Sequence, residues 1–334
     1  MIPATVVIVN YNGGQTILRC LQALTESHPA DRIVVVDNAS IDGSSRLIRD
    51  AFPSVSILPL RNNTGFARAV NIAASRIRHD GAIVTLNPDT VPAPGFVDAL
   101  VAPLADNPGL GSTAGTLVFT SNPSVVASAG IRVHRNGVAL DAHLGESLDS
   151  LATEAQPIFG PSGGAAAYRL AAFREAGGFC EAFFLYLEDV DLAWRLRLLG
   201  WESLAAPGAI AQHDYSSSSV EGSPFKRRLL ARNRIWTLAR CLPEEIWLRD
   251  RASILMFDLL AAGHGTVMRD RASLQGRVAA LAGLPMRLRE RTAIHARSSV
   301  DSCDIDRWIA PAVSPRKLLR LRKMTSALAQ SSTR

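Results

Sequence analysis

Apolar runs alternate with amphipathic segments along the N-terminal part of this chain. The apolar runs are rich in β-branched residues and have the length of buried strands; they are Thr5 to Asn10, Ile33 to Val36, Val55 to Leu60 and Ala82 to Leu86. Segments with helical spacing of apolar positions connect them, at Thr16 to Ser27, Asp42 or Ser44 to about Ala51, and Ala67 to Arg78. This βαβαβαβ order predicts an α/β fold with a mostly parallel, Rossmann-like central sheet and helices on both faces.

The pattern is less regular after the fourth predicted strand. Further helices are expected at Phe96 to Leu104 and Leu170 to Ala176. Further strands are expected at Gly109 to Phe119, Ser128 to His134 and Trp201 to Ala205. Residues 135–157 carry scattered Gly, Asp, Glu and Ser, which predicts a long loop of the kind that forms a lid. Small residues at 160–167 would let the backbone approach a ligand closely, although a tightly packed turn explains them equally well.

Three carboxylates, Glu188, Asp189 and Asp191, lie within four residues, at the start of a predicted amphipathic helix. Asp191 and Arg195 are four residues apart, so they can pair on one helical face. The other two acids follow the aromatic and apolar run 183–187, and such surroundings can raise the pKa of a carboxyl towards the range of a general base. The alternative is that acids at a helix N-terminus only cap it and suit its dipole.

Charge divides the chain in two. Residues 1–225 hold 14 Arg, no Lys and 21 Asp or Glu, a net charge of −7, whereas residues 226–334 hold 22 Lys or Arg and 9 Asp or Glu, a net charge of +13. We therefore predict a domain over 1–225 and a basic, mainly helical extension over 226–334, whose last part, 315–334, is expected to fray. Such asymmetry suggests a surface that faces an anionic partner such as a membrane, and a solvated arginine-rich surface is the alternative.

Several classes of protein fit poorly. The four cysteines are far apart and form no CxxC pair, which argues against a disulfide framework or a zinc site and fits a reducing cytosol. We expect no signal peptide, because the N-terminus has no basic region, and no membrane-spanning helix, because no apolar run is long enough. A dinucleotide-binding fold and a P-loop NTPase are poorly supported without GxGxxG or GxxxxGK[ST]. A cytoplasmic protein is expected.

Polar residues gather at the ends of the four predicted parallel strands: Asn10 with Tyr11, Asp37, Asn63 with Gly65, and Asp89. Ligands of such sheets bind beyond the carboxyl ends of the strands. The sequence therefore predicts a binding site at this edge of the sheet.

The order of these motifs resembles the family 2 glycosyltransferases of the GT-A fold, most closely their rhamnosyltransferase branch. The matching segments are VIVNYNG (7–13), VVDNAS (35–40), NTGFA (63–67), LNPDT (86–90), GGA (163–165), YLEDVDLAWR (186–195) and His213. Each motif alone is weak, but the ordered set is specific, and it covers about residues 4–240. The remainder resembles only loosely the helical, often membrane-associated extensions of relatives, which implies a peripheral location on the inner face of the plasma membrane.

The resemblance implies a nucleotide-sugar donor, UDP- or dTDP-linked and plausibly dTDP-L-rhamnose. Asp37 would accept a hydrogen bond from the pyrimidine N3–H, and Val9 and Tyr11 would pack around base and ribose. Asn63, Gly65 and Arg68 would lie near ribose and phosphate; these roles come from the resemblance alone.

A metal site is implied as well. Asp89 and His213 would hold Mg²⁺ or Mn²⁺ against the diphosphate, since hard oxygen ligands suit these ions. Relatives often carry an acid where Asn87 stands, so one anionic group near the metal is missing here. The hydroxyls of residues 216–219, four serines, could donate to phosphate oxygens.

Asp189 would be the catalytic base of a single inverting displacement, and Glu188 would bind hydroxyls of donor or acceptor, with an exchange of these two roles left open. Asp191 would act structurally through Arg195. Gly163 and Gly164 would let the backbone approach the sugars. The implied acceptor is a polyprenyl-linked or other cell-envelope glycan precursor.

Two other functions are weighed against this one. A nucleotidyltransferase would carry a basic, Gly-rich loop after the first strand, and residues 10–14 contain no Lys or Arg. A non-catalytic nucleotide-sugar-binding module would not need the acidic cluster at 188–191. Nucleic-acid binding is disfavoured, because the basic region has few aromatic residues to stack on bases.

Overall fold

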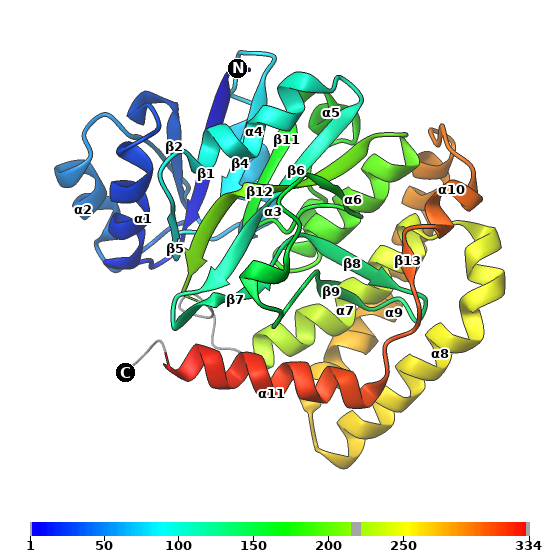
Figure 1. The fold of residues 1–334 in the computed structure, drawn as a ribbon. Helices are drawn as coiled ribbons and strands as arrows, with labels where there is room; N and C mark the ends of the chain where they lie inside the picture. Colours follow the sequence, from blue (N-terminus) through cyan, green and yellow to red (C-terminus); the bar gives the residue numbers. More distant parts are fainter. Residues whose placement is uncertain (1, 215–221, 332–334) are drawn as a thin grey trace.

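The computed structural model describes residues 2–214 and 222–331, and its core is a large mixed sheet between helices (Figure 1). The four β-branched runs form β1 (Ala4–Asn10), β2 (Ile33–Asp37), β3 (Ser56–Pro59) and β4 (Ala82–Leu86). Helices α1 (Thr16–Thr25), α2 (Ser44–Ala51) and α3 (Gly65–Ala74) connect these strands. The strands pair in parallel in the order β3-β2-β1-β4, which confirms the predicted parallel half of the sheet.

Beyond β4 the sheet becomes mixed. β11 (Ala165–Arg169) lies between β4 and β6 (Leu110–Phe119) and runs antiparallel to both. β12 (Glu202–His213) runs parallel to β6, so its carboxyl end reaches the edge at which β1, β2 and β4 end. Short strands complete the sheet: β5 (Thr90–Pro92), β7 (Asn122–Ser128) and β10 (Gln156–Pro157).

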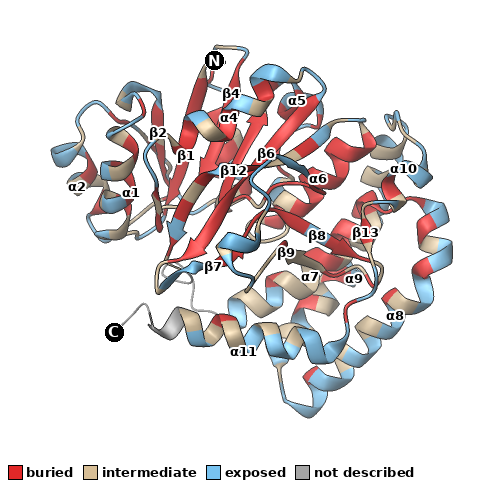
Figure 2. Cartoon of the chain, in the orientation of Figure 1, coloured by how far each residue is buried: buried red, intermediate tan, exposed pale blue. Residues whose placement is uncertain are grey.

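Helices cover both faces of the sheet and bury its apolar side chains (Figure 2). α1, α2 and α4 (Phe96–Asp106) pack on one face. α3, α5 (Leu170–Glu175) and α6 (Glu188–Leu198) pack on the other, where Leu192 and Leu196 of α6 are fully buried. Because both faces are covered, the central strands β1, β2 and β4 are mostly apolar rather than alternating.

The C-terminal part consists mainly of helices: α7 (Pro224–Cys241), α8 (Glu244–Val267), α9 (Arg271–His295), α10 (Ser302–Asp306) and α11 (Pro315–Ser331). α7 packs against α6 and α9, and a further apolar cluster joins Trp194 of α6 to Ile246 and Ile254 of α8. The chain is therefore α/β with a helical C-terminal region, as predicted. Within the described ranges, no helix combines the length and the apolar character needed to cross a membrane.

One expectation needs correction in part. Residues 135–157 are not one continuous loop, because β8 (Ile131–His134) and β9 (Ala139–Asp141) form a hairpin turned through Gly137, whose φ is +72°. Residues 142–155 are mostly irregular, as predicted, and contain only a short 3-10 helix, Leu148–Ser150. β13 (Ile309–Ala310) adds to this hairpin as a parallel strand. Most of the segment predicted to fray lies in α11, in which Thr325 is buried and Leu318 and Leu321 are partly covered; residues 332–334 lie outside the described part of the chain.

Candidate active site

A cavity of about 510 Å³ opens at the carboxyl edge of the sheet. Three walls come from regions whose importance the sequence indicated: the turn after β4, the glycines before β11 and the start of α6. The predicted site residues in these walls and at the end of β12 are Asn87, Asp89, Gly163, Gly164, Glu188, Asp189 and His213. The fold thus brings together side chains that are up to 126 residues apart in the sequence, as between Asn87 and His213.

Asp189 lies in the first turn of α6 and faces the cavity. Its Oδ2 accepts a hydrogen bond from the Gly163 N–H at 2.8 Å, and its Oδ1 accepts one from the Val190 N–H at 2.8 Å. Burial raises the pKa of Asp189 above its ordinary value, and these two N–H donors only partly oppose that effect. The carboxylate is thus oriented by two backbone donors and is more basic than an exposed aspartate, which suits proton abstraction.

Glu188 is buried at the same helix start and also lines the cavity. Burial, followed by the negative charge of Asp189, raises the pKa of Glu188 well above its usual range. Its Oε2 atom has no hydrogen-bond partner among the described side chains and backbone. Two neighbouring carboxyls that resist simultaneous ionisation can divide the roles of base and hydroxyl ligand, and the more exposed Asp189 is better placed as the base.

The turn that presents these acids is conformationally strained. Phe184, Tyr186 and Leu187 have φ values of 67°, 69° and 64°, which residues other than glycine rarely adopt. Asn233 of α7 is fully buried beneath the turn, and its Nδ2 donates to the carbonyls of Phe183, Leu185 and Tyr186 at 3.1, 3.0 and 2.7 Å. One side chain from the C-terminal region thus fixes the turn that precedes the acids.

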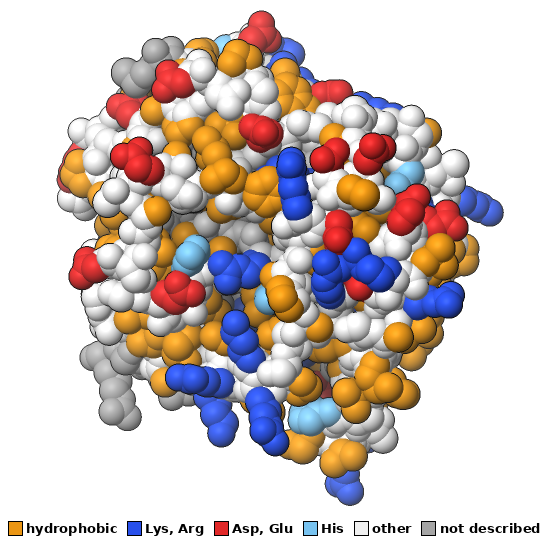
Figure 3. Space-filling view, turned by 45° about the vertical axis from the view of Figure 1, so that its right-hand side comes forward, with side chains coloured by type: hydrophobic (Ala, Val, Ile, Leu, Met, Phe, Trp, Pro, Cys, Tyr) orange, Lys and Arg blue, Asp and Glu red, His pale blue; other side chains and the backbone are white. Residues whose placement is uncertain are grey.

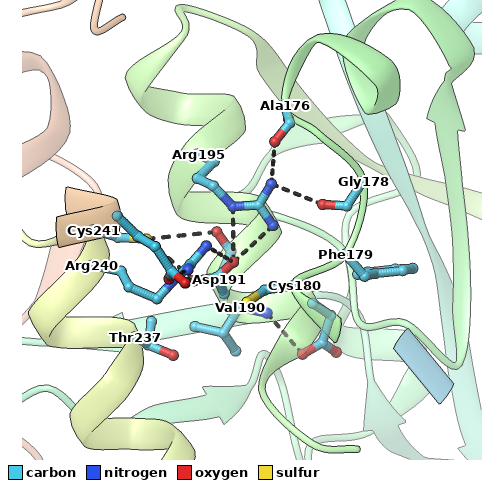
Figure 4. Close-up of polar contacts among 12 residues, drawn as sticks. Ala176, Gly178, Phe179, Cys180, Val190, Asp191, Arg195, Thr237, Arg240 and Cys241 are labelled. Carbon is cyan, nitrogen blue, oxygen red and sulfur yellow. Dashed lines mark hydrogen bonds and ion pairs between the residues drawn. The ribbon is translucent and has the colours of Figure 1, made fainter. Parts of the chain in front are cut away.

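Asp191 is anchored away from the cavity by two arginines (Figure 4). Its carboxylate lies 2.7 Å from Arg195 Nη2 and 2.6 Å from Arg240 Nε, and all three residues are buried. Arg195 also donates to the carbonyls of Ala176 and Gly178. Burial alone would raise the pKa of Asp191, but the two guanidinium charges outweigh it and hold the pKa below its usual range. The pairing with Arg195 matches the sequence expectation, and the contact with Arg240 adds to it.

Asp89 and His213 meet in the cavity wall, with Asp89 Oδ1 and His213 Nε2 3.2 Å apart. Burial alone would lower the pKa of His213, but the carboxylate of Asp89 outweighs it and raises the pKa. The two atoms are close enough to contact one divalent cation together; the carboxylate oxygen suits Mg²⁺ or Mn²⁺, whereas an imidazole nitrogen is the preferred ligand of softer ions. In residues 2–214 and 222–331, no group of three or more His, Cys, Asp or Glu side chains could hold a metal, so other ligands would come from substrate and water.

Asn87 and Gly164 support this side of the cavity. Asn87 N donates to Gly164 O at 3.0 Å, and its side-chain Nδ2 lies 3.5 Å from His213 Nε2. A Cβ at Gly164 would come within 2.8 Å of Asn87 Nδ2, so a larger residue there would displace the Asn87 amide. The four serines at 216–219 lie outside the described residues.

The residues predicted for the nucleotide lie at the same sheet edge but not in the cavity wall. Asn10 and Asp37 are register partners at the ends of β1 and β2 and are buried, and Tyr11 after them is exposed. Asp37 Oδ1 accepts from Ser40 N at 3.2 Å. Val9 is nearly buried in β1.

The loop before α3 is fixed by its own contacts. Asn63 Oδ1 accepts hydrogen bonds from Asn38 Nδ2 at 2.9 Å and from Gly65 N at 3.0 Å. Gly65 has φ +79°, and a Cβ there would lie 2.3 Å from Phe184 O, so it touches the strained turn. Arg68 is exposed and lies 3.7 Å from Glu181.

The sequence did not single out three contributors to the cavity. Asp141 of β9 lines it, and burial raises the pKa of this carboxyl to about 6, opposed by Ser128 and reinforced by Asp189. Lys226 of α7 and Arg322 of α11 also line the cavity. Asp141 belongs to the segment expected to be a loop, and both basic residues belong to the region considered only for its charge, so no local signal identified them.

Several known proteins are similar to this chain in sequence. The family model described as "Glycosyl transferase family 2" matches residues 5–177. The N-acetylglucosaminyl-diphospho-decaprenol L-rhamnosyltransferase of Mycobacterium tuberculosis is 30% identical over 237 residues, which is 64% of this chain and 76% of that protein.

Solved structures with the GT-A fold are similar in architecture. The mannosyltransferase PcManGT from Pyrobaculum calidifontis, in complex with GDP-Man and Mn²⁺, has a TM-score of 0.53 and 18% identity over 99% of this chain and 85% of that chain. S. aureus TarS 1-349 in complex with UDP-GlcNAc has a TM-score of 0.54 and 15% identity over 98% of this chain and 89% of that chain. At such identities the likeness supports the shared fold.

Proposed function

Because this chain belongs to glycosyl transferase family 2, we propose that it transfers L-rhamnose, with inversion, from a dTDP- or UDP-linked donor to a hydroxyl of a lipid-linked glycan precursor. That the chain is a glycosyltransferase follows from its family; the inversion, donor, metal and acceptor are the proposal. It rests above all on one observation, that Asp189 shares a cavity with the Asp89–His213 pair.

Asp189 is proposed as the base. Its carboxylate takes the proton of the acceptor hydroxyl while that oxygen forms a bond to the anomeric carbon and the bond from this carbon to the departing diphosphate breaks. One displacement needs one base and no enzyme nucleophile, so the anomeric configuration inverts. Support comes from the raised pKa of Asp189 and from the Gly163 and Val190 N–H groups that orient it. Glu188 would hold a sugar hydroxyl beside it.

The diphosphate of the donor would lie beside Asp89 and His213. These two residues would hold Mg²⁺ or Mn²⁺, which supplies positive charge to neutralise the departing nucleoside diphosphate. The nucleoside would then extend along the sheet edge towards Asp37 and Tyr11, with Val9 beneath it. Asn63, Gly65 and Arg68 would line the loop near ribose and phosphate, while Asn87, Gly163 and Gly164 shape the wall at the sugar.

The acceptor is proposed from the name of the relative, which acts on a diphospho-decaprenol lipid carrying N-acetylglucosamine. A lipid-linked acceptor would place the reaction at a membrane surface, proposed here as the cytoplasmic one, and the +13 charge of residues 226–334 would favour an anionic membrane. On the face drawn in Figure 3, Lys and Arg side chains concentrate in the lower half, to which the C-terminal helices belong. Part of the charge is internal, since Arg234 and Arg240 are buried in ion pairs.

The test is a transfer assay with purified protein, preceded by a thermal-shift screen of nucleotide sugars with and without Mn²⁺. A bound donor raises the melting temperature by mass action, so the screen ranks bases and sugars. We expect dTDP-L-rhamnose to give the largest shift, the shift to depend on Mn²⁺ or Mg²⁺, and rhamnose to appear on a GlcNAc-diphospho-lipid. A larger shift of the melting temperature with another nucleotide sugar would identify that sugar as the donor instead. Nucleotide-sugar binding without transfer to any acceptor would favour a non-catalytic module.

A further inference from the structure

Helix α11 is held across the cavity at both ends. Before the helix, Asn136 Nδ2 donates to Val313 O at 2.9 Å, and both residues are buried. Towards its end, Ser121 Oγ donates to Leu328 O at 2.9 Å. Between these anchors, Leu318, Leu321, Arg322 and Thr325 line the cavity. Their spacing puts them on one helical face, so α11 turns a single face to the cavity.

That face brings a cation next to the start of α7. A Cβ on Gly222 would lie 3.3 Å from Arg322 Nη2, which places the guanidinium beside the residue that precedes the cap of α7. Lys226, in the first turn of α7, lines the same cavity, and its charge lowers the pKa of Asp141 across the cavity. Two cations and the positive end of an 18-residue helix therefore converge on one side of the cavity.

Arg227 provides a contrast. It also lines the cavity, but its Nε lies 3.0 Å from Asp270, so its charge is largely compensated. Within residues 2–214 and 222–331, no carboxylate pairs with Arg322 in this way, and its side chain is exposed at the cavity rim. A guanidinium at the cavity rim and a lysine that lines the same cavity suit an anion with several oxygen acceptors.

We propose that α11 completes the active site and that Arg322, together with Lys226, binds a substrate diphosphate. This inference rests on the proposed function, in which two diphosphates occur: that of the nucleotide donor and that of the lipid-linked acceptor. Both diphosphates present the same anionic oxygens to Arg322 and Lys226. In either case the C-terminal helix is a substrate-binding element, and the two sources differ in which kinetic constant depends on Arg322.

The experiment compares Arg322→Gln and Arg322→Lys with Arg320→Gln, a matched control on the exposed side of α11 that does not line the cavity. Each protein is assayed with a GlcNAc-diphospho-lipid and with octyl N-acetylglucosaminide, which lacks the diphosphate, and the KM of the donor is measured for both. Melting temperatures establish that all variants fold.

We expect Arg322→Gln to lower kcat/KM for the diphosphate acceptor about tenfold and to leave kcat/KM for the octyl glycoside unchanged. This result would show that Arg322 binds the diphosphate of the acceptor. A rise of about tenfold in the KM of the donor with both acceptors would instead assign the donor diphosphate. Arg322→Lys should retain most of the activity, since the charge is kept, and Arg320→Gln should match the wild type. The proposal is overturned if Arg322→Gln behaves as Arg320→Gln does, or lowers transfer to both acceptors equally with the KM of the donor unchanged.

A binding measurement separates this inference from the proposed function. Geranyl diphosphate is titrated calorimetrically into the wild type and Arg322→Gln. If the wild type transfers no sugar but binds this probe through Arg322, the proposed function fails and the anion site stands. If transfer proceeds and binding of the probe is the same in both proteins, the anion site fails alone.

Discussion

Asn233 Nδ2 lies 2.7 Å from the carbonyl oxygen of Tyr186, two residues before Glu188. The contact joins α7 of the C-terminal region to the strained turn at the mouth of the cavity. The same nitrogen reaches the carbonyls of Phe183 and Leu185. Without Asn233, the carbonyls of Phe183, Leu185 and Tyr186 would each lose one donor while the backbone still held unfavourable φ values. The position of the acids at the start of α6 therefore depends on a residue 47 positions away in the sequence from Tyr186.

Asn233→Ala should lower both stability and catalysis. Removing a buried amide that serves several carbonyls should cost about 2–3 kcal/mol of the free energy of unfolding. The released turn should also lower kcat by about tenfold or more, because small displacements of a catalytic group are costly. Urea unfolding and steady-state kinetics measure the two effects. The control is Thr237→Ala, one turn along α7, whose hydroxyl donates to Asn233 O; an equal loss of kcat in both variants would contradict the role of Asn233.

Gly65→Ala should destabilise the fold more than Gly43→Ala does, although the two glycines have similar backbone angles. Gly65 and Gly43 have φ of +79° and +80°, but a Cβ on Gly65 would lie 2.3 Å from Phe184 O, whereas a Cβ on Gly43 would meet nothing within 4 Å. Gly43→Ala should therefore cost about 1 kcal/mol from the left-handed angle alone. Gly65→Ala should exceed this by about 2 kcal/mol and lower activity, because the strained turn must move. Similar costs in denaturant unfolding would contradict the close approach.

Glu188→Gln should stabilise the fold at alkaline pH while lowering activity. Folding raises the pKa of the Glu188 carboxyl. Such a group makes its full contribution to the stability of the fold at pH values below its unfolded pKa, and this contribution is lost as the pH rises through the folded pKa. The amide introduced by Glu188→Gln does not ionise, so the stability of the variant does not fall with rising pH for this reason. At pH 8 the variant should be more stable than the wild type by about 1 kcal/mol or more, with a smaller difference at pH 5. Thermal unfolding across this range measures it, and a difference independent of pH would show that Glu188 does not titrate abnormally.

Asp191→Asn should lower the stability of the fold by the same amount at pH 5 and at pH 7.5, unlike Glu188→Gln, whose effect depends on pH. The folded pKa of Asp191 is depressed, so its ion pairs stabilise above the unfolded pKa and are lost only as pH falls through the still lower folded value. Breaking the buried contacts with Arg195 and Arg240 should cost about 3–5 kcal/mol, equally at pH 5 and pH 7.5. Replacement of the exposed Asp50 by Asn serves as a control with little expected effect. A cost that grows between these pH values would place the pKa of Asp191 within them.

Local patterns were sufficient to predict half of the sheet and the location of the acids. Residues 6–9 are all apolar because helices cover both faces, and β1 lies there with its polar turn at the sheet edge. The position of Asp189 at a helix start was predicted for a similar reason, since acids that follow an aromatic run and precede a helical pattern are visible in the sequence.

Long-range contacts could not be predicted in this way. Asp141 reaches the cavity only because β9 folds back on β8, and Arg322 only because Val313 is anchored to Asn136, 177 residues away. Nothing within a few residues of either position encodes these contacts. The antiparallel insertion of β11 between β4 and β6 is likewise set by tertiary pairing rather than by its own composition.

The most direct test of the proposed mechanism is the rate of transfer by Asp189→Asn at saturating donor and acceptor, measured with the donor dissociation constant of the same protein. The isosteric amide can still accept from one of the Gly163 and Val190 N–H groups through its oxygen, but it loses the other bond and cannot take up the acceptor proton. We predict that kcat falls by about 10²–10⁴-fold and that donor affinity stays within about twofold of the wild type. Transfer at the wild-type rate by a folded Asp189→Asn protein would contradict the assignment of Asp189 as the base.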